Sequence, residues 1–252
     1  MVETVYSIGT PVSIALLPDF HSGRPEPVLE SLRLHRPDLI AVPGDFVVGS
    51  VPAQGLKMLH SGTSLDFLRG CAGVAPTFVS LGNHEWMLAP EDISLIEETG
   101  CTVLDNSWVE HDSLVIGGLT SGRVSEYRKW RSLQPSFPRY PYNGTPSRSA
   151  RLVPDTAWLR AYVQTPGYHV LLCHHPEYWR YLKYKNIELI LSGHAHGGQW
   201  RIRNHGIYAP GQGFWPELTS GVLENRLVIS RGLSNSELIP RLNNPTEMVY
   251  IQ

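Results

Sequence analysis

The sequence predicts a layered α/β fold, and three observations support this prediction. Short apolar runs typical of buried strands alternate along the chain with segments of helical periodicity. Gly, Pro or polar residues follow nearly every run and mark where each strand ends. The 252 residues are enough for a substantial core, and they contain no internal repeats or obvious linkers. We therefore expect one domain spanning residues 1–252.

The first half of the chain is expected to alternate three strands with three helices. The strands are Val12–Leu17, Asp38–Val42 and Pro76–Leu81, and the helices are Val28–Arg36, Leu56–Leu68 and Glu91–Thr99. Pro37 stops the first helix because proline cannot continue a helical hydrogen-bond ladder. Gly100 provides the third helix with a favourable C-terminal stop.

The second half repeats this alternation, with one interruption. The expected strands are Ser113–Leu119, Tyr168–Leu172, Ile187–Ile190, Gly206–Ala209, Arg226–Ser230 and Glu247–Ile251, and the helices are Asp155–Gln164 and Glu177–Lys185. Trp158 and Tyr162 stand at helical spacing, and Asp155 is the expected N-cap. The interruption lies between the strand Ser113–Leu119 and this helix: residues 122–151 lack apolar periodicity and are expected to form an irregular insertion.

Composition excludes several functional classes. Hydrophobic residues make up 42% and charged residues 17%, which is typical of a globular protein, and the net charge of −2 gives no general attraction to nucleic acid. Three widely spaced cysteines favour a reducing compartment. No signal peptide is visible in Met1–Thr10, and no apolar run reaches the length of about eighteen residues that a transmembrane segment needs. We expect a cytoplasmic protein, with peripheral membrane association left open, and the oligomeric state is open as well.

Two histidines, His194 and His196, follow the strand Ile187–Ile190 and are surrounded by glycines. Neutral imidazole is the commonest nitrogen ligand of transition metals, so this pair is a candidate metal site. On this motif alone, loop histidines hydrogen-bonded to the backbone explain the pattern equally well.

Potential ligands follow five successive predicted strands, and this repetition favours the metal site. They are Asp19 and His21, Asp45, Asn83 and His84, His174 and His175, and His194 and His196. In layered α/β folds, ligands bind outside the carboxyl ends of the strands. Imidazole with carboxylate and no thiolate suits Mn, Fe, Zn, Ni or Co. Seven ligands exceed the needs of one ion and suit two that share a carboxylate, an arrangement that serves phosphoryl chemistry.

The motif series resembles the calcineurin-like metallophosphoesterase superfamily. It reads Asp19-x-His21, Gly44-Asp45, Gly82-Asn83-His84-Glu85, His174 and Gly193-His194-x-His196, in the order of that superfamily. The resemblance implies a four-layer α/β/β/α sandwich of two mixed sheets with the metal site at the strand C-terminal ends. The extended Gly193–Gln199 and the later Ala209–Gly213 resemble the branch of YkuE- and YaeI-type phosphoesterases, some of which act on membrane or envelope phosphate esters.

The resemblance also implies a role for each motif residue. Asp19, His21 and His196 would hold the first metal, Asn83, His174 and His194 the second, and Asp45 would bridge both. His84 would be the catalytic non-ligand histidine, donating a proton or a hydrogen bond to the leaving oxygen. Glu85 either orders its loop or lies at the surface. His175 either contacts phosphate or hydrogen-bonds the backbone, and we favour the backbone.

The irregular insertion at 122–151 is either a substrate cap or an ordinary surface excursion. It interleaves basic and aromatic side chains that suit phosphate and planar groups: Arg123, Arg128, Lys129, Arg131, Arg139, Arg148 and Arg151 with Tyr127, Trp130, Phe137, Tyr140 and Tyr142.

We expect a hydrolase with two divalent ions, Mn²⁺ being the first choice, that cleaves a phosphodiester or small phosphomonoester by attack of a metal-bridging hydroxide. The substrate would be a small phosphate ester, with a lipid or envelope phosphate as one option. The alternative function is a non-catalytic scaffold of the same fold.

Overall fold

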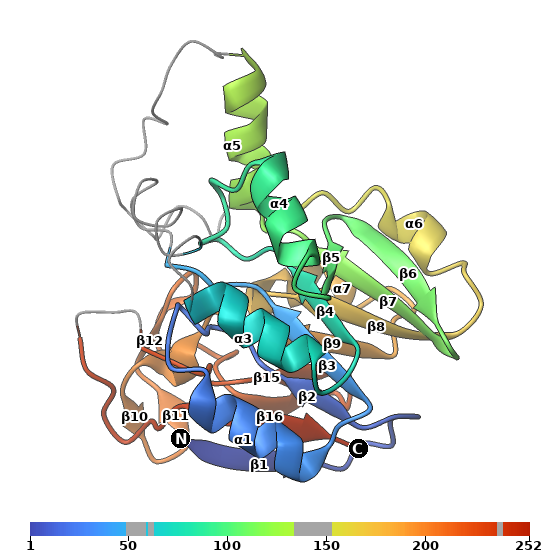
Figure 1. Ribbon diagram of the computed structural model, residues 1–252. Coiled ribbons are helices and arrows are strands. Elements are labelled where there is room, and N and C mark those ends of the chain that lie inside the picture. Colours follow the sequence, from blue (N-terminus) through green and yellow to red (C-terminus); the bar gives the residue numbers. More distant parts are fainter. Residues whose placement is uncertain (49–58, 60–62, 134–152, 236–238) are drawn as a thin grey trace.

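Two six-stranded sheets form the centre of the molecule (Figure 1). This computed structural model describes residues 1–48, 59, 63–133, 153–235 and 239–252. The first sheet has the order β1-β16-β2-β3-β4-β5, and the second has the order β14-β15-β9-β8-β7-β6. Helices cover the outer faces of both sheets, so the layers follow the order α/β/β/α (Figure 1). This confirms the predicted fold class.

The first sheet combines the N-terminal strands with the last strand of the chain. Its members are β1 (Val2–Tyr6), β2 (Ile14–Leu16), β3 (Leu39–Pro43), β4 (Thr77–Ser80), β5 (Thr102–Leu104) and β16 (Glu247–Ile251). β2, β3, β4 and β5 pair in parallel, whereas β16 runs antiparallel to β2. Because parallel neighbours end at the same edge, the loops after β2, β3 and β4 lie next to one another.

The second sheet is also mixed, with parallel strands at its centre. Its members are β6 (Ser107–His111), β7 (Leu114–Leu119), β8 (Tyr168–Cys173), β9 (Leu189–Ser192), β14 (Gly221–Leu223) and β15 (Leu227–Ile229). β7, β8, β9 and β15 pair in parallel, and the two edge strands, β6 and β14, are antiparallel to their neighbours. The loops after β7, β8 and β9 therefore also share one edge.

Alternation along the strands builds three cores. Leu16 on β2 and Leu172 on β8 belong to the core between the two sheets, whereas their strand neighbours, Ala15 and Cys173, belong to the outer cores. Successive side chains of a strand point to opposite faces, so strands covered on both sides are apolar throughout. The strands of the site are consequently fixed from both faces.

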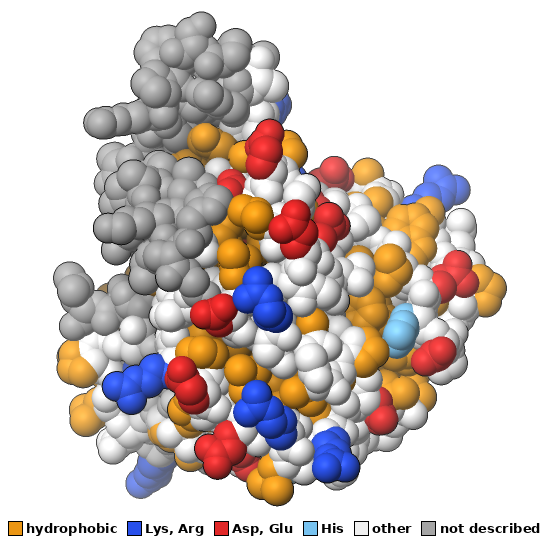
Figure 2. Space-filling model, viewed as in Figure 1, with side chains coloured by type: hydrophobic (Ala, Val, Ile, Leu, Met, Phe, Trp, Pro, Cys, Tyr) orange, Lys and Arg blue, Asp and Glu red, His pale blue; other side chains and the backbone are white. Residues whose placement is uncertain are grey.

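Helices complete the outer layers. The first sheet is covered by α1 (Glu26–His35), α3 (Thr63–Ala72) and α4 (Pro90–Glu97), and α1 and α3 lie side by side on it (Figure 1). The second sheet is covered by α6 (Leu159–Tyr162), η2 (Pro176–Tyr178) and α7 (Trp179–Leu182). Acidic and basic side chains are interspersed over the face that carries α1 and α3 (Figure 2), as the small net charge leads one to expect.

Several predicted segments differ from the structure, among them the strand expected over Gly206–Ala209, which is divided between β11 (His205–Gly206) and β12 (Tyr208–Ala209). The first part of the expected irregular insertion forms a helix, α5 (Gly122–Leu133), which projects away from the sheets (Figure 1), and residues 134–151 lie outside the described residues. Buried Val124 and half-buried Tyr127, three residues apart, join the first outer core, so α5 begins with an apolar stripe too short to be noticed in the sequence.

The helix predicted over Asp155–Gln164 shrinks to α6. Asp155 Oδ1 accepts the N–H of Ala157 at 3.0 Å, but the residue that precedes the helix is Trp158. Likewise, η2 and α7 replace the single helix expected over Glu177–Lys185. Of the helix expected over Leu56–Leu68, residues 56–58 and 60–62 lie outside the described residues.

Two small hairpins lie between β9 and β14. They pair β10 (Arg201–Ile202) with β11 (His205–Gly206), and β12 (Tyr208–Ala209) with β13 (Gly213–Phe214). Within the described residues, no helix combines the length and the apolar character that crossing a membrane requires.

Candidate metal centre

The structure brings the predicted ligands together from both sheets. Asp19 and His21 follow β2, Asp45 follows β3, and Asn83 follows β4. From the second sheet, His174 follows β8, and His194 and His196 follow β9. All seven side chains belong to residues at most 5% exposed. Three of the groups of side chains close enough to hold a metal ion are formed largely by these residues.

The backbone of these loops is unusual at the candidate ligands. Asp19, His21, Asp45, His194 and His196 all have positive φ, between 46° and 64°. Asp and His tolerate this left-handed region better than most residues, but five occurrences in one cluster are uncommon. Such conformations persist where surrounding structure enforces them, and they gather at functional sites. The positive φ values show that these five residues leave their strands in sharp turns, which bring their side chains into one cluster.

Glycines allow the loops to approach one another closely. A Cβ atom on Gly82 would overlap Asp45 Oδ1, and one on Gly44 would overlap the backbone of Gly82. A Cβ on Gly193 would lie 2.5 Å from Asp19 Oδ2. These positions require glycine because the carboxylates of Asp19 and Asp45 lie directly against the main chain of neighbouring loops.

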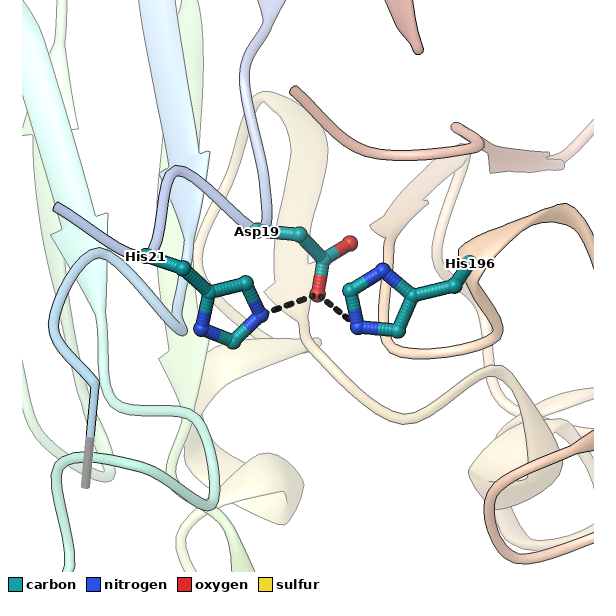
Figure 3. Close-up of side chains that lie close together, drawn as sticks. All are labelled: Asp19, His21 and His196. Carbon is teal, nitrogen blue, oxygen red and sulfur yellow. Dashed lines mark ion pairs between the residues drawn. The ribbon is translucent and has the colours of Figure 1, made fainter. Parts of the chain in front are cut away.

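The first group consists of Asp19, His21 and His196 (Figure 3). Asp19 Oδ1 lies 3.8 Å from His21 Nε2 and 3.7 Å from His196 Nε2. Both histidine rings point their Nε2 atoms at the carboxylate oxygen (Figure 3). Burial, reinforced by the charge of His84, lowers the pKa of His21 to about 4, so this ring is neutral at pH 7 and offers a lone pair.

The second group consists of Asp45, His174 and His194. His174 Nε2 lies 3.0 Å from Asp45 Oδ2, and the His174 and His194 ring centroids are 5.0 Å apart. Burial is the largest single influence and lowers the pKa of His174, but the charge and hydrogen bond of Asp45, together with the charges of Asp19 and Glu85, outweigh it and raise that pKa to about 9. Asp45 also lies 4.0 Å from His21 Nε2, so its carboxylate stands between the two groups.

The donor set fits divalent cations. Within the described residues, the buried atoms His21 Nε2, Asn83 Oδ1, His174 Nε2 and His194 Nε2 make no hydrogen bond of normal geometry. Leaving such atoms unsatisfied is costly. Cations would satisfy those of His21, Asn83 and His174, whereas His194 Nε2 also lies 3.6 Å from the Glu177 carboxylate. The Nδ1–H groups of His21 and His174 donate to the carbonyls of Val47 and Pro43, at 3.3 and 2.8 Å, so a cation would be coordinated through Nε2 of each ring.

His196 differs from these two histidines because its Nδ1 faces an arginine. Arg241 Nη2 lies 2.9 Å from His196 Nδ1 and 2.6 Å from the carbonyl oxygen of Ser234. Guanidinium only donates, so Nδ1 accepts and the ring proton resides on Nε2, facing Asp19. Coordination of a cation through His196 Nε2 therefore requires that the contact with Arg241 be given up. No local pattern in the sequence indicates Arg241, which lies 45 residues further along the chain.

Glu85 orders the loops, and the alternative of a surface position is wrong. The residue is fully buried. Its Oε2 accepts the N–H groups of Asp45 and Gly82, both at 2.8 Å, and its Oε1 accepts the N–H of Val47 at 3.2 Å. Burial, followed by the charge of Asp45, raises the pKa of Glu85 to about 8.

His84 stands at the edge of the cluster. Its Nε2 is 3.8 Å from Asp45 Oδ2, and its side chain is 19% exposed, whereas the neighbouring ligands are closed off. The His84 N–H donates to Asp45 Oδ1 at 2.9 Å. Burial lowers the pKa of His84, and the charge of Arg123 lowers it further against the opposing effect of Asp45. The ring is therefore mainly neutral at pH 7.

His175 bonds to side chains rather than to the backbone contact that the sequence favours. Its Nε2 lies 2.8 Å from Ser121 Oγ, and its Nδ1 lies 3.3 Å from Glu177 Oε1. Glu177 Oε1 is also 3.6 Å from His194 Nε2. Neither Ser121 nor Glu177 was predicted from the sequence, although each follows the end of a predicted strand.

Comparison with known proteins agrees with this geometry. The family model of the calcineurin-like phosphoesterases matches residues 12–198. Among curated proteins, YpbG of Bacillus subtilis is 23% identical over 94% of this chain and 79% of its own length. The metallophosphoesterase YkoQ of the same organism is 27% identical, over 75% of this chain and 62% of its own. The phosphodiesterase YaeI of Escherichia coli is also 27% identical, over 76% of this chain and 63% of its own.

This chain therefore spans less than two thirds of YkoQ and YaeI. A solved structure of the sulfate thiohydrolase SoxB from Termus thermophilus has a TM-score of 0.41 and 14% identity, covering 71% of this chain and 35% of that one.

Proposed function

We propose that this chain, which belongs to the calcineurin-like phosphoesterase family, hydrolyses phosphate esters with two divalent cations. One observation carries the proposal: buried ligand atoms from five strand ends of two sheets converge, and those of His21, Asn83 and His174 lack hydrogen-bond partners among the described residues. Histidines with a purely structural role normally have their buried nitrogens hydrogen-bonded, which is not the case here. Metallophosphoesterase relatives support the reaction class.

The proposal assigns the ligands to two ions. Asp19, His21 and His196 hold the first ion, Asn83, His174 and His194 hold the second, and Asp45 contributes to both. When bound, such a pair of ions supplies Lewis acidity that activates water and neutralises phosphate oxygens. The chain's own contribution is to hold the seven side chains in place before substrate arrives, because reorganising them during the reaction would slow it.

His84 acts on the leaving group in this proposal. It is the most exposed histidine around Asp45, and its backbone is anchored to that carboxylate. Since burial keeps the ring mainly neutral, we propose that it donates a hydrogen bond from a ring N–H to the departing ester oxygen. Loss of His84 should therefore slow the reaction without removing the ions.

The base of α5 supports a substrate contact. Arg123, in the first turn of α5, is 5% exposed, and its guanidinium lies 5.0 Å from the ring centre of Trp86, two residues after His84. Its charge lowers the pKa values of His84 and His175, although burial lowers both more strongly. We propose that Arg123 attracts the phosphate group. Between α4 and α5, a cavity of about 820 Å³ lined mainly by apolar side chains, among them Met87, Ile93 and Tyr127, suits an organic substituent of the ester.

The test compares metal content with turnover. We expect purified protein with added Mn²⁺ to hydrolyse p-nitrophenyl phosphate or its bis-ester, and the preferred compound distinguishes monoesterase from diesterase. Asp45→Ala should bind fewer ions and lose turnover at least 10³-fold, on the order of the loss of a key electrostatic group. His84→Ala should keep both ions and lose about 10²-fold.

The exposed Glu97→Ala serves as the control and should behave as wild type. Full activity in Asp45→Ala would exclude the shared-carboxylate centre. Bound ions with no turnover on any phosphate ester of a broad panel would favour a non-catalytic scaffold.

A further inference from the structure

Glu177 lies beside the metal centre but belongs to no ligand set assigned above. It comes from η2, three residues after the candidate ligand His174 and two after His175. Its side chain is only 11% exposed, and its Oε2 is buried without a hydrogen-bond partner among the described residues. A carboxylate in such a position needs donors, and two imidazole rings face its other oxygen.

The His194 ring stands between Glu177 and the second group of ligands. Its Nε2 is 3.6 Å from Glu177 Oε1, and its ring centre is 5.0 Å from that of His174. His194 is the one residue that belongs both to the group with Asp45 and His174 and to the group with His175 and Glu177 among the groups found in the described residues. An imidazole has two nitrogens, so it can serve both sides at once.

The neighbouring hydrogen bonds fix the direction of the donors. An ionised Glu177 carboxylate only accepts hydrogen bonds, so the facing nitrogen of His175 is the donor. The other nitrogen, Nε2, then accepts the Ser121 hydroxyl at 2.8 Å, while Ser121 Oγ accepts the Arg123 backbone N–H at 3.3 Å. His175 then carries its proton on Nδ1, 3.3 Å from Glu177 Oε1. The hydrogen bonds therefore run in one direction, from the Ser121 hydroxyl to His175 and from His175 to the Glu177 carboxylate.

We infer that Glu177 is a positioning residue for His194: it accepts the His194 Nε2–H and leaves Nδ1 as the nitrogen for the second ion. A histidine ligand commonly donates its other ring N–H to a carboxylate, which fixes the tautomer and raises the basicity of the ligand atom. His175 and Ser121 hold the Glu177 carboxylate in place from the opposite side. The inference rests on the proposed metal centre and deepens it.

A second carboxylate–histidine pair provides a matched control. Glu188 Oε2 lies 2.9 Å from His169 Nδ1. His169 stands at the start of β8, whereas the candidate ligand His174 follows the other end of that strand. Glu188→Gln removes a charge beside a buried histidine just as Glu177→Gln does. It should leave the metal centre unaffected because neither partner is a candidate ligand.

The experiment measures Zn²⁺ stoichiometry and affinity by equilibrium dialysis on the full chain. Wild type should bind two ions. Glu177→Gln should weaken one of them by about 10–100-fold, the usual cost of losing such a partner, while Glu188→Gln weakens neither. Ser121→Ala, a milder change, should weaken the same ion by a smaller factor, and it replaces Glu177→Gln if that variant does not fold.

Nitrogen-15 NMR of the zinc-loaded protein supplies a readout independent of affinity. A His194 signal, identified by its absence in His194→Gln, should show a proton on Nε2 shifted downfield, and this shift should diminish in Glu177→Gln. A proton on His194 Nδ1, or unchanged zinc affinity in both Glu177→Gln and Ser121→Ala, would overturn the inference. Three ions in wild type and two in Glu177→Gln would also overturn it, because Glu177 would then be a ligand.

These outcomes separate the two proposals. If the wild-type protein binds no ion, the proposed function itself is wrong. Wild type that binds two ions and hydrolyses phosphate esters, with Glu177→Gln unchanged in both measurements, removes only the role of Glu177.

Discussion

Single buried residues hold the candidate centre in shape, and Glu85 is the clearest example. One carboxylate accepts three backbone N–H groups, from Asp45, Val47 and Gly82, and so joins the loop after β3 to the loop after β4. Both carboxylate oxygens accept backbone N–H groups, so the contribution of Glu85 is to fix the position of the Asp45 backbone. Its function is therefore structural, and it should be visible in stability as well as in metal binding.

Glu85→Ala should destabilise the protein by about 3 kcal/mol or more, since three buried donors each lose an acceptor at about 1–3 kcal/mol. Affinity for Mn²⁺ should fall with it because Asp45 is no longer fixed. Urea unfolding of the metal-free protein measures the first effect, and metal titration measures the second. Glu97→Ala, on the exposed face of α4, should change stability by less than about 0.5 kcal/mol. Equal stability of the two variants would contradict this role of Glu85.

Arg241 is a single residue that should oppose ion binding, whereas Glu85 supports it. Its guanidinium contacts His196 Nδ1 and adds positive charge beside the first group of ligands. Arg241→Ala should raise the affinity for one ion by about tenfold, equivalent to ~1.4 kcal/mol, because a like charge and a competing donor are removed. Isothermal titration with Mn²⁺ tests this, with exposed Arg203→Ala as the control. Weaker ion binding in Arg241→Ala would show instead that the guanidinium supports His196.

At the scale of elements, strand ends determine where the ligands meet, and loop glycines determine how closely. Gly82 lies in the loop after β4. Its backbone packs directly against the carboxylate of Asp45, which lies in the loop after β3. Both strands are held rigidly by cores on their two faces. A change in this contact cannot be absorbed by shifting the strands, so it must displace Asp45.

Gly82→Ala should therefore weaken Mn²⁺ binding at least tenfold and cost roughly 1–3 kcal/mol of stability, as overpacking does. Gly73→Ala is the matched control, because a Cβ there would have its nearest neighbours at 3.4 and 3.5 Å, an ordinary contact. Metal titration and thermal unfolding of both variants measure the difference. Tight ion binding in Gly82→Ala would mean that the loops yield more easily than the sheet packing indicates.

The accuracy of sequence-based prediction differs between elements for physical reasons. β16 matches its predicted bounds, and the strands that carry ligands are predicted to within two residues at each end, because strands buried on both faces appear as continuous apolar runs. β1 and β6 were not predicted, since these edge strands are only partly buried and carry polar residues. α6 is short because one turn suffices to pack Tyr162 against Gly117, which no periodicity reveals.

The candidate site follows the same logic. Its seven ligand candidates are predictable because each follows a recognisable strand, and parallel strands bring their ends together. Glu177 and Arg241 were not predicted, since their roles depend on contacts with His194 and His196 across the fold. Sequence patterns report on local structure and burial, whereas such pairings arise only when distant loops meet.

For the whole molecule, the candidate centre joins the two sheets. Asp19, His21, Asp45 and Asn83 come from loops of the first sheet, and His174, His194 and His196 come from loops of the second. The His194 N–H already donates to Asp19 Oδ2 at 3.1 Å across this junction. Cations held by both sets would therefore tie the halves of the fold together and oppose their separation during unfolding.

Saturating Mn²⁺ should raise the melting temperature of the metal-free protein. Binding at a hundred times Kd stabilises the folded state by about 2.7 kcal/mol per ion, which corresponds to roughly 5–10 °C for a chain of this size. Scanning calorimetry with and without Mn²⁺ measures the shift, and a chelator should reverse it. Asp45→Asn should show little of this shift, because the carboxylate that this variant loses is shared between the two ions in the proposed centre. An equal shift in Asp45→Asn would mean that the stabilising ions bind elsewhere, so that the junction of the sheets is held by packing and hydrogen bonds alone.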